Sequence, residues 1–369
     1  KRAHSEKYIK DIKDKTLDKN TIKKIGFPLV DSVVQRSLVA TGGTVLASKL
    51  AINFGLACNT AGGSHHANFE GGAGYCVFND VAVAAHYLLD RGLAGRILIV
   101  DLDVHQGNGS ADIFKDNRNV FTFSMHSKSN YPAKKSTSNL DIELDDNLED
   151  AQYIKILKFY LKKLNEENFD FVFYIAGVDI HFNDRLGKLK ISDEGIRKRD
   201  EIVTENFFSK GVPLCGVLGG GYNKDFEKLV ELHSFLHQSC VKLLWLMSKK
   251  NPNLSAEQKL VMFEDGTEPP GTSELNNEKR EGSYHCANCG IKLFDSKTKY
   301  ESGSGWPSFF QSLPDVFETK TDYLLGYART EYHCKNCDAH HGHIFDDGPQ
   351  PTGKRYCNNG VCLVFKPKN

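Results

Sequence analysis

Two Cys-x-x-Cys pairs near the C-terminus constrain the fold of this chain more than any other feature. They are Cys286-Ala-Asn-Cys289 and Cys334-Lys-Asn-Cys337. Four thiolates at this spacing can close a tetrahedral Zn²⁺ site, which predicts a structural zinc. Cys357 stands alone behind the second pair. It is left outside the predicted zinc site, and a structural metal beside an uncommitted thiol suggests redox chemistry.

The length and charge of the chain exclude several classes of protein. A chain of 369 residues predicts two domains. Lys+Arg and Asp+Glu are 47 each, so no global positive field collects phosphates, and we expect no nucleic-acid partner. No apolar run is long enough to cross a bilayer and residues 1–24 lack a signal-peptide core, so we expect a cytoplasmic protein with no membrane partner.

Two further expectations come from the cysteines and the first residue. Ten cysteines could in principle form a disulfide framework, but six of them lie at or after Cys286 with metal-type spacing. We therefore expect thiols and metal ligands. The chain does not begin with Met, which suggests a processed or truncated product.

The first two-thirds of the chain alternates short apolar runs with helical patterns. The runs Ile97–Val100, Phe171–Ile175 and Val212–Leu218 each end in polar or glycine residues. Such runs separated by helices predict an α/β parallel sheet with helices on both faces. Ligands bind such sheets beyond the carboxyl ends of the strands. The predicted helices are Asp80–Leu89, Leu148–Leu164, Ile196–Phe208 and Phe226–Met247.

The pattern breaks in the predicted linker 249–253. Residues 1–248 form the first predicted domain. Residues 254–369 begin with one short helical stretch and continue as a Gly-, Cys- and aromatic-rich region. This composition is typical of a small, mainly β domain held by zinc.

The ends of the apolar runs carry the first candidate site. Asp103 and His105 alternate along an extended segment, so both can face one ion, and Asp179 completes a mixed ligand set. Three protein ligands leave a position open for water on Zn²⁺. His65-His66 on a Gly-rich loop offer a base, and Tyr222 offers a phenol to a developing oxyanion. Each feature alone has a structural explanation, but together they favour a hydrolytic site.

Four segments of this region carry a family resemblance. They are Gly62–Asn79, Ile99–Gly109, Ala176–Leu189 and Leu218–Asn223. Together they resemble the zinc-dependent histone deacetylases, which have an arginase/deacetylase-like fold. The stretches Gln106–Gly109 and Asp184–Gly187 bring the chain closest to the class IV branch. The resemblance covers roughly residues 1–246 and implies hydrolysis of an acyl-lysine or acyl-amine substrate.

The resemblance also implies residue roles. It makes Asp103, His105 and Asp179 the zinc ligands and His66 the general base. His65 becomes the partner imidazole held by Asp101, and Tyr222 the stabiliser of the oxyanion. The remaining implied features are a K⁺ near Asp101, Asp103 and Ser124, and a substrate-tunnel wall at Tyr75.

The chain departs from the deacetylase pattern in two places. Asn108 stands where some relatives have Asp, so His66 is expected to be less basic. Relatives also carry additional sequence before the region that matches residues 1–11, including the first strand, so we expect an uncovered sheet edge. A domain that binds acyl-lysine without turnover is therefore the alternative to an active deacetylase.

The second candidate site is the lone thiol Cys357. Arg355 precedes it by two residues, and His340, His341 and His343 cluster after the second cysteine pair. These neighbours predict a lowered pKa or a positioned acid. Trp306 offers an aromatic surface to a methyl group. A zinc-ribbon adaptor is the alternative for this region, but it leaves Cys357 and the histidines without a role.

Residues 254–366 resemble methionine-R-sulfoxide reductases of the B type (MsrB) nearly end to end. The matching motifs are Thr267–Pro270, Gly305–Phe309, Gly342–Gly348 and Arg355–Asn359. The resemblance makes Cys357 the nucleophile, which is left as a sulfenic acid. It also implies that His340 and His343 polarise or protonate the oxygen and that the Trp306 indole receives the methyl group. The side chains that help to position the site and tune the thiol are Arg355, Asp347 and Asn359.

The implied partners are oxidised proteins that contain methionine-R-sulfoxide, together with thioredoxin or another thiol reductant. Many relatives have a resolving cysteine where this chain has Ser304. Cys362 lies five residues from Cys357, and in one strand the two side chains would face opposite sides. We therefore expect an external thiol to reduce the sulfenic acid directly.

Overall fold

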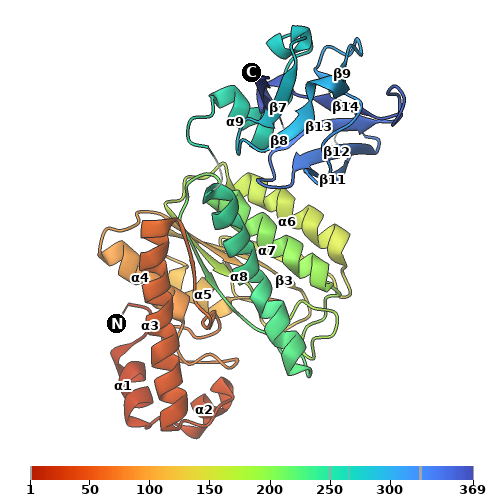
Figure 1. The fold of residues 1–369 in the computed structure, drawn as a ribbon. Coiled ribbons are helices and arrows are strands. Elements are labelled where there is room, and N and C mark those ends of the chain that lie inside the picture. Colours follow the sequence, from red (N-terminus) through yellow and green to blue (C-terminus); the bar gives the residue numbers. More distant parts are fainter. Residues whose placement is uncertain (1, 249–250, 265, 324–325, 369) are drawn as a thin grey trace. The chain divides into compact units, whose positions relative to one another are not determined.

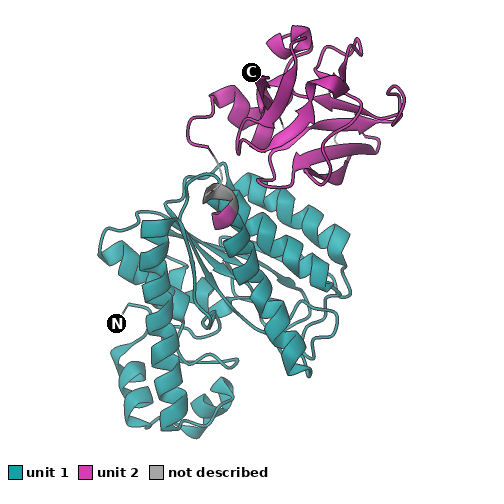
Figure 2. Cartoon of the chain, in the orientation of Figure 1, with its two compact units in different colours: residues 1–243 teal, residues 244–369 magenta. Residues whose placement is uncertain are grey.

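The computed structural model describes residues 2–248, 251–264, 266–323 and 326–368. The chain divides into two compact units, unit 1 (residues 1–243) and unit 2 (residues 244–369), as Figure 2 shows. The predicted linker 249–253 falls in part on residues 249 and 250, which lie outside the described residues.

Unit 1 is built on a six-stranded parallel sheet with the strand order β1-β6-β5-β2-β3-β4. The predicted parallel α/β architecture is therefore confirmed. The edge strand β1 has only three residues, and a short strand leaves few backbone groups open to another chain. The strands are β1 (Leu56–Cys58), β2 (Ile97–Asp101), β3 (Val120–Ser127), β4 (Leu140–Leu144), β5 (Phe171–Ile175) and β6 (Leu214–Val217).

Helices cover both faces of this sheet because alternate strand residues point to opposite sides (Figure 1). Leu98 and Val100 of β2 pack in a core with α6 (Asp150–Leu164), α7 (Asp193–Phe208) and α8 (Phe226–Ser248). Ile97 and Ile99 pack in a second core with residues of α3 (Asp31–Phe54), α4 (Asp80–Asp90) and α5 (Asn108–Phe114). The strands are apolar on both sides for this reason.

The four predicted helices correspond to α4, α6, α7 and α8; one end of each agrees, and the other differs by one to three residues. The long helix α3 and the short helices α1 (Glu6–Asp14) and α2 (Lys19–Ile25) were not predicted from the sequence. The apolar side chains of α1 and α2 form a separate small core with Val77 and Phe78.

Unit 2 is a small, mainly β domain, as predicted. Its one α-helix among the described residues after 250 is α9 (Ala256–Phe263). The strands form antiparallel sheets of six strands (β11-β12-β13-β14-β10-β9) and three strands (β15-β7-β8). Their bounds are β7 (Gly282–Cys286), β8 (Lys292–Asp295), β9 (Lys299–Tyr300), β10 (Ser308–Phe309), β11 (Phe317–Asp322), β12 (Arg329–Cys334), β13 (His340–Phe345), β14 (Arg355–Asn358) and β15 (Leu363–Pro367).

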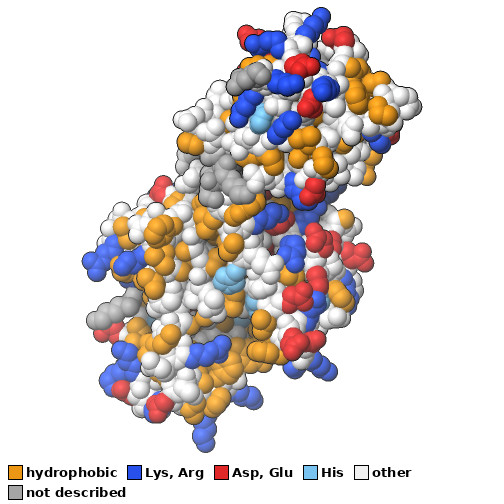
Figure 3. Space-filling view, in the orientation of Figure 1, with side chains coloured by type: hydrophobic (Ala, Val, Ile, Leu, Met, Phe, Trp, Pro, Cys, Tyr) orange, Lys and Arg blue, Asp and Glu red, His pale blue; other side chains and the backbone are white. Residues whose placement is uncertain are grey.

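The surface carries charges of both signs. On the face shown in Figure 3, basic and acidic side chains are interspersed, in keeping with 47 of each in the chain. Among the described residues, no helix combines the length and the apolarity that crossing a membrane requires.

Candidate functional sites

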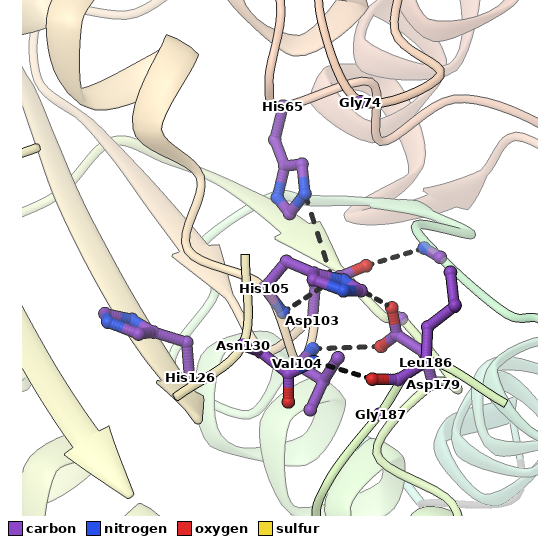
Figure 4. Close-up of polar contacts among 12 residues, drawn as sticks. His65, Gly74, Asp103, Val104, His105, His126, Asn130, Asp179, Leu186 and Gly187 are labelled. Carbon is purple, nitrogen blue, oxygen red and sulfur yellow. Dashed lines mark hydrogen bonds and ion pairs between the residues drawn. The ribbon is translucent and has the colours of Figure 1, made fainter. Parts of the chain in front are cut away.

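The carboxyl ends of β2 and β5 bring three ligand-type side chains together. Asp103 and His105 follow β2, Asp179 follows β5, and all three are buried with their ligand atoms within 4.8 Å of one another. His105 Nδ1 lies 3.1 Å from Asp103 Oδ1 and 3.0 Å from Asp179 Oδ2 (Figure 4). This is the set that the sequence predicted for one ion.

The charges of this set suit a divalent cation. Burial and the neighbouring Asp103 carboxylate raise the pKa of Asp179 to about 7. Burial opposes protonation of His105, but Asp103 and Asp179 outweigh it and raise the pKa of His105 to about 10. Protons bound at this set thus compensate the negative charge of two buried carboxylates that lie close together. A Zn²⁺ bound by two carboxylates and one imidazole would provide that compensation and leave a coordination position open.

The tandem histidines differ in charge although their ring centroids are only 4.1 Å apart. Burial disfavours a charge on His65, but Asp101, whose Oδ2 lies 2.7 Å from His65 Nδ1, and Asp103 raise its pKa to about 9. Burial and the charged neighbour His65 lower the pKa of His66 well below 6.5. His66 Nδ1 lies 2.7 Å from Asn108 Oδ1. Neighbouring groups with separated pKa values are typical of acid/base pairs, and His66 is the neutral member.

Tyr222 reaches the same site from the loop after β6. Its backbone N–H donates to Asp184 Oδ2 over 2.7 Å, which ties this loop to the Asp184–Gly187 turn. Burial and the nearby carboxylates raise the pKa of Tyr222, so the phenol is neutral and able to donate. Tyr75 and Tyr222 both line a cavity of about 390 Å³ that also contains His66 and His105. Tyr75 is thus placed where a tunnel wall is expected.

Two residues that shape this site were not predicted from the sequence. The Tyr131 ring packs edge-on against His66 at 4.8 Å between centroids, and no motif singles it out. The fully buried Arg199 donates to the backbone carbonyls of Ala176 and Gly177, just before Asp179. Its position on α7, at helical spacing from the buried Ile196 and Val203, was the available signal. Ser124 is the register partner of Asp101 in the sheet, and the predicted K⁺ stays a prediction.

In unit 2 the four paired cysteines converge. Cys286 ends β7 and Cys334 ends β12, and each is followed by a tight turn to the second cysteine of its pair. The Sγ atoms of Cys286 and Cys337 are 3.7 Å apart, and those of Cys289 and Cys334 are 3.6 Å apart. Four sulfurs about 2.3 Å from a tetrahedral Zn²⁺ are about 3.8 Å from one another. The cysteine cluster therefore fits zinc. All ten cysteines of the chain lie among the described residues, and none of them forms a disulfide.

Cys357 lies outside this cluster, in the middle of the six-stranded sheet. On β14 it pairs with Ser308 of β10 on one side and with His343 of β13 on the other. Directly opposed residues of antiparallel strands share a face, so the thiol and the His343 ring lie side by side. The Cys357 Sγ is 3.8 Å from the Oγ of Ser304. Ser304 is the residue that replaces the resolving cysteine expected from the resemblance.

Each of the two implied catalytic histidines has a carboxylate partner that the sequence analysis missed. His340 Nδ1 lies 2.6 Å from Glu331 Oε1, and His343 Nε2 lies 2.9 Å from Asp322 Oδ2. Glu331 and Asp322 belong to strands β12 and β11, so only knowledge of the strand pairing would have found them. His341 is fully buried against Phe317 and does not join this pair.

The remaining implied residues are held by hydrogen bonds and an ion pair. The Trp306 Nε1–H donates to the Glu268 carbonyl over 2.8 Å, which fixes the half-buried indole. Asn359 Nδ2 lies 3.3 Å from His340 Nε2, and its Oδ1 accepts from the Glu268 N–H. Arg355 forms a two-pronged ion pair with Asp347, with both distances 2.8 Å.

Two expectations about the thiols need correction. Burial raises the pKa of Cys357 above 9.0, and the hydroxyl of Ser304 and the charge of Arg355 only partly offset it, so the predicted lowering is absent. Cys362 does not share a strand with Cys357, because β14 ends at Asn358 and Cys362 lies in the 3₁₀ turn Gly360–Cys362. It is 0% exposed, so burial keeps it from acting as a resolving thiol.

Comparison with known families gives one match for each part of the chain. Residues 1–234 match a family model described as a histone deacetylase domain, and residues 254–367 match one described as a SelR domain. An uncharacterized protein of Picosynechococcus is 47% identical over 238 residues, which cover 64% of this chain and 79% of that protein. The SelR match supports a reductase over the zinc-ribbon alternative.

The relatives of unit 2 are named reductases. A peptide methionine sulfoxide reductase MsrB of Pseudomonas putida strain W619 is 53% identical over 118 residues, which cover 31% of this chain and 88% of that protein. The MsrB of a second strain is 48% identical over 118 residues, which cover 31% and 89%. The chain thus belongs to the histone deacetylase family through its first 234 residues and carries an MsrB (SelR) domain at residues 254–367.

Proposed function

We propose that unit 2 reduces methionine-R-sulfoxide in oxidised proteins and that Cys357 is its nucleophile. The sulfur of Cys357 attacks the sulfoxide sulfur, the substrate S–O bond breaks, and the oxygen remains on Cys357 as a sulfenic acid. The Cys357 sulfur loses two electrons and the methionine sulfur gains them. The observation that carries this proposal is the placement of an uncommitted thiol beside His343 and outside the cysteine cluster.

The neighbouring side chains have distinct tasks in this reaction. His340 and His343 face the thiol from one strand and can supply the proton that the leaving oxygen requires. Trp306 is held by Glu268 and offers an apolar surface to the substrate methyl group. Arg355, held by Asp347, favours the thiolate over the thiol, although burial outweighs it in the free protein.

The sulfenic acid must be returned to a thiol before the next turnover. Ser304 occupies the contact to Cys357 where a resolving thiol would act, and Cys362 is buried. An external reductant, either thioredoxin or a small thiol, therefore attacks Cys357 directly: two thiols yield one disulfide and one water. A set of ten free cysteines suits a reducing compartment, which supports a cytoplasmic location.

Turnover of a peptide containing methionine-R-sulfoxide tests this proposal. The full chain should convert the R epimer and not the S epimer, Cys357→Ser should abolish turnover, and Cys362→Ser should retain it. Activity that survives in Cys357→Ser would reject the proposal.

We propose further that unit 1 hydrolyses an acyl-lysine or acyl-amine. A Zn²⁺ held by Asp103, His105 and Asp179 would polarise the carbonyl and lower the pKa of a water molecule. His66 is neutral and can take the proton of the attacking water, while the His65–Asp101 pair keeps a positive charge beside it. The neutral Tyr222 phenol can donate a hydrogen bond to the oxyanion. The burial of this complete set at one sheet edge favours catalysis over binding alone.

Release of acetate from an acetyl-lysine peptide tests the second activity. The full chain with zinc should show turnover, and Tyr222→Phe should reduce it by about 10²–10³-fold, the range for loss of one oxyanion donor. Binding of the acetyl-lysine peptide without turnover would reject catalysis and leave an acyl-lysine-binding domain.

A further inference from the structure

A third group of ligand-type side chains lies in unit 2, separate from the cysteine cluster and from Cys357. Glu331 and His333 belong to β12, and His340 begins β13. Their ligand atoms all lie within 4.8 Å of one another. His333 and His340 are register partners in the sheet, so both imidazoles reach the same carboxylate from neighbouring strands.

Ion pairing alone does not explain this geometry. Glu331 Oε1 lies 3.2 Å from His333 Nε2 and 2.6 Å from His340 Nδ1. Both nitrogens are buried, and neither makes a hydrogen bond of acceptable geometry. The two side chains are about nine-tenths buried, with 12% and 10% exposed. Two buried imidazole nitrogens are thus directed at one carboxylate oxygen without a well-aligned hydrogen bond, an arrangement expected of ligand atoms that converge on an ion.

We propose that Glu331, His333 and His340 bind a divalent first-row transition-metal ion. Two imidazoles and one carboxylate are a common ligand set for Zn²⁺, Co²⁺ and related ions, and three protein ligands leave room for water. The second nitrogen of His333 supports this assignment. Its Nδ1 lies 3.1 Å from the backbone carbonyl of Asp338, and a proton held there leaves Nε2 with a free lone pair.

The site has a consequence for the reductase, which rests on the function proposed above. A metal at Nδ1 of His340 prevents this imidazole from taking up a second proton. This removes the imidazolium form of His340, the acid that the sulfoxide oxygen needs. The bound metal therefore inhibits reduction, and it does so without contacting Cys357.

A Co²⁺ titration of the full chain tests the site. Zn²⁺ binds such sites more tightly than Co²⁺, so the cysteine-bound zinc stays in place. Wild type should bind one more Co²⁺ per chain than His333→Gln or Glu331→Gln. His285→Gln is the matched control, because His285 precedes Cys286 on a strand as His333 precedes Cys334. It should bind as many ions as wild type. Any Co²⁺ site in unit 1 is present in wild type and in every variant, so it does not change the difference in bound Co²⁺ between them.

Two readouts make the outcome decisive. Equal Co²⁺ stoichiometry in wild type and both variants, with the cysteine-bound zinc retained, would overturn the proposal. In the second readout, added Zn²⁺ should slow sulfoxide reduction in wild type and in His285→Gln, but much less in His333→Gln. Equal slowing in all three would overturn the inhibitory role. The metal count does not depend on turnover, so failure of the site and failure of the reductase are distinguishable.

Discussion

The imidazole rings of His340 and His343 lie 5.7 Å apart between centroids, although the two residues are three positions apart in β13. In a regular strand, residues at this spacing face opposite sides. The register of β12 and β13 shifts so that Tyr332 pairs with Gly342 and His333 with His340, which leaves His341 as an extra residue. This β-bulge brings both implied catalytic imidazoles to the face that carries Cys357.

The first prediction concerns Gly342, which follows the bulge. A methyl group at this position would lie 1.9 Å from the Cys357 carbonyl oxygen, so Gly342→Ala must push β13 away from β14. This separates His343 from the thiol, and a displacement of about 1 Å can cost about 10²-fold in rate. We expect a loss of that order in sulfoxide reduction, measured with the zinc content as a control for folding. Unchanged turnover would show that the strand pairing does not position the site.

The second prediction concerns acid stability. Burial lowers the pKa of His341 to about 3, and neither ring nitrogen makes a hydrogen bond. As the pH falls below 6.5, the unfolded chain binds a proton that the folded chain does not, so stability is lost between pH 6.5 and about 3. His341→Leu removes this loss and should raise the free energy of unfolding by about 2 kcal/mol at pH 5 relative to wild type.

Urea denaturation followed by the fluorescence of Trp306, in a Trp245→Phe background, measures this effect, because Trp306 lies in unit 2 whereas Trp245 lies on α8. A variant that is less stable than wild type at pH 5 would contradict the prediction.

The third prediction concerns the reactivity of Cys357. Burial raises its pKa above 9.0, so the thiol is mostly protonated at pH 7 and the thiolate fraction rises about tenfold per pH unit below the pKa. Alkylation by iodoacetamide, followed by mass spectrometry, should accelerate accordingly between pH 7 and 9. Arg355→Gln should slow it further, because the favourable charge is lost. Lys354→Gln, which removes a neighbouring cation paired with Asp346, should not. Fast alkylation at pH 6 would show a thiol with a lowered pKa.

The fourth prediction concerns the base of the proposed deacetylase. Asn108→Asp puts a carboxylate beside His66 Nδ1 and should raise the pKa of His66. The base must be unprotonated, so the acid limb of kcat/KM should move to higher pH by about one unit or more. Acetate release between pH 5 and 8 measures this shift. An acid limb that stays in place would exclude His66 as the titrating base.

Much of the fold and the site could be predicted from local sequence. The apolar runs ending at Val100 and Ile175 predicted β2 and β5, and alternation along residues 101–105 placed Asp103 and His105 together. The Cys-x-x-Cys spacing predicted the four-sulfur cluster. These features depend on neighbours in the chain, where periodicity is informative.

Contacts between distant strands could not be predicted in this way. Glu331 and Asp322 pair with the histidines only because β11, β12 and β13 pair in one register. The bulge at His341 has no sequence pattern that would predict it. The pKa of Cys357 depends on burial by the whole domain, so the nearby Arg355 was misleading. Strand β1 has three residues, too few for a pattern.

The most direct test of the central claim is a single turnover without reductant. The full chain is mixed with excess methionine-R-sulfoxide peptide and dimedone, and the products are located by mass spectrometry. We expect one reduced methionine per chain and one dimedone adduct, on Cys357, and neither product in Cys357→Ser. Reduction by Cys357→Ser, or an adduct on one of the clustered cysteines in place of Cys357, would contradict it.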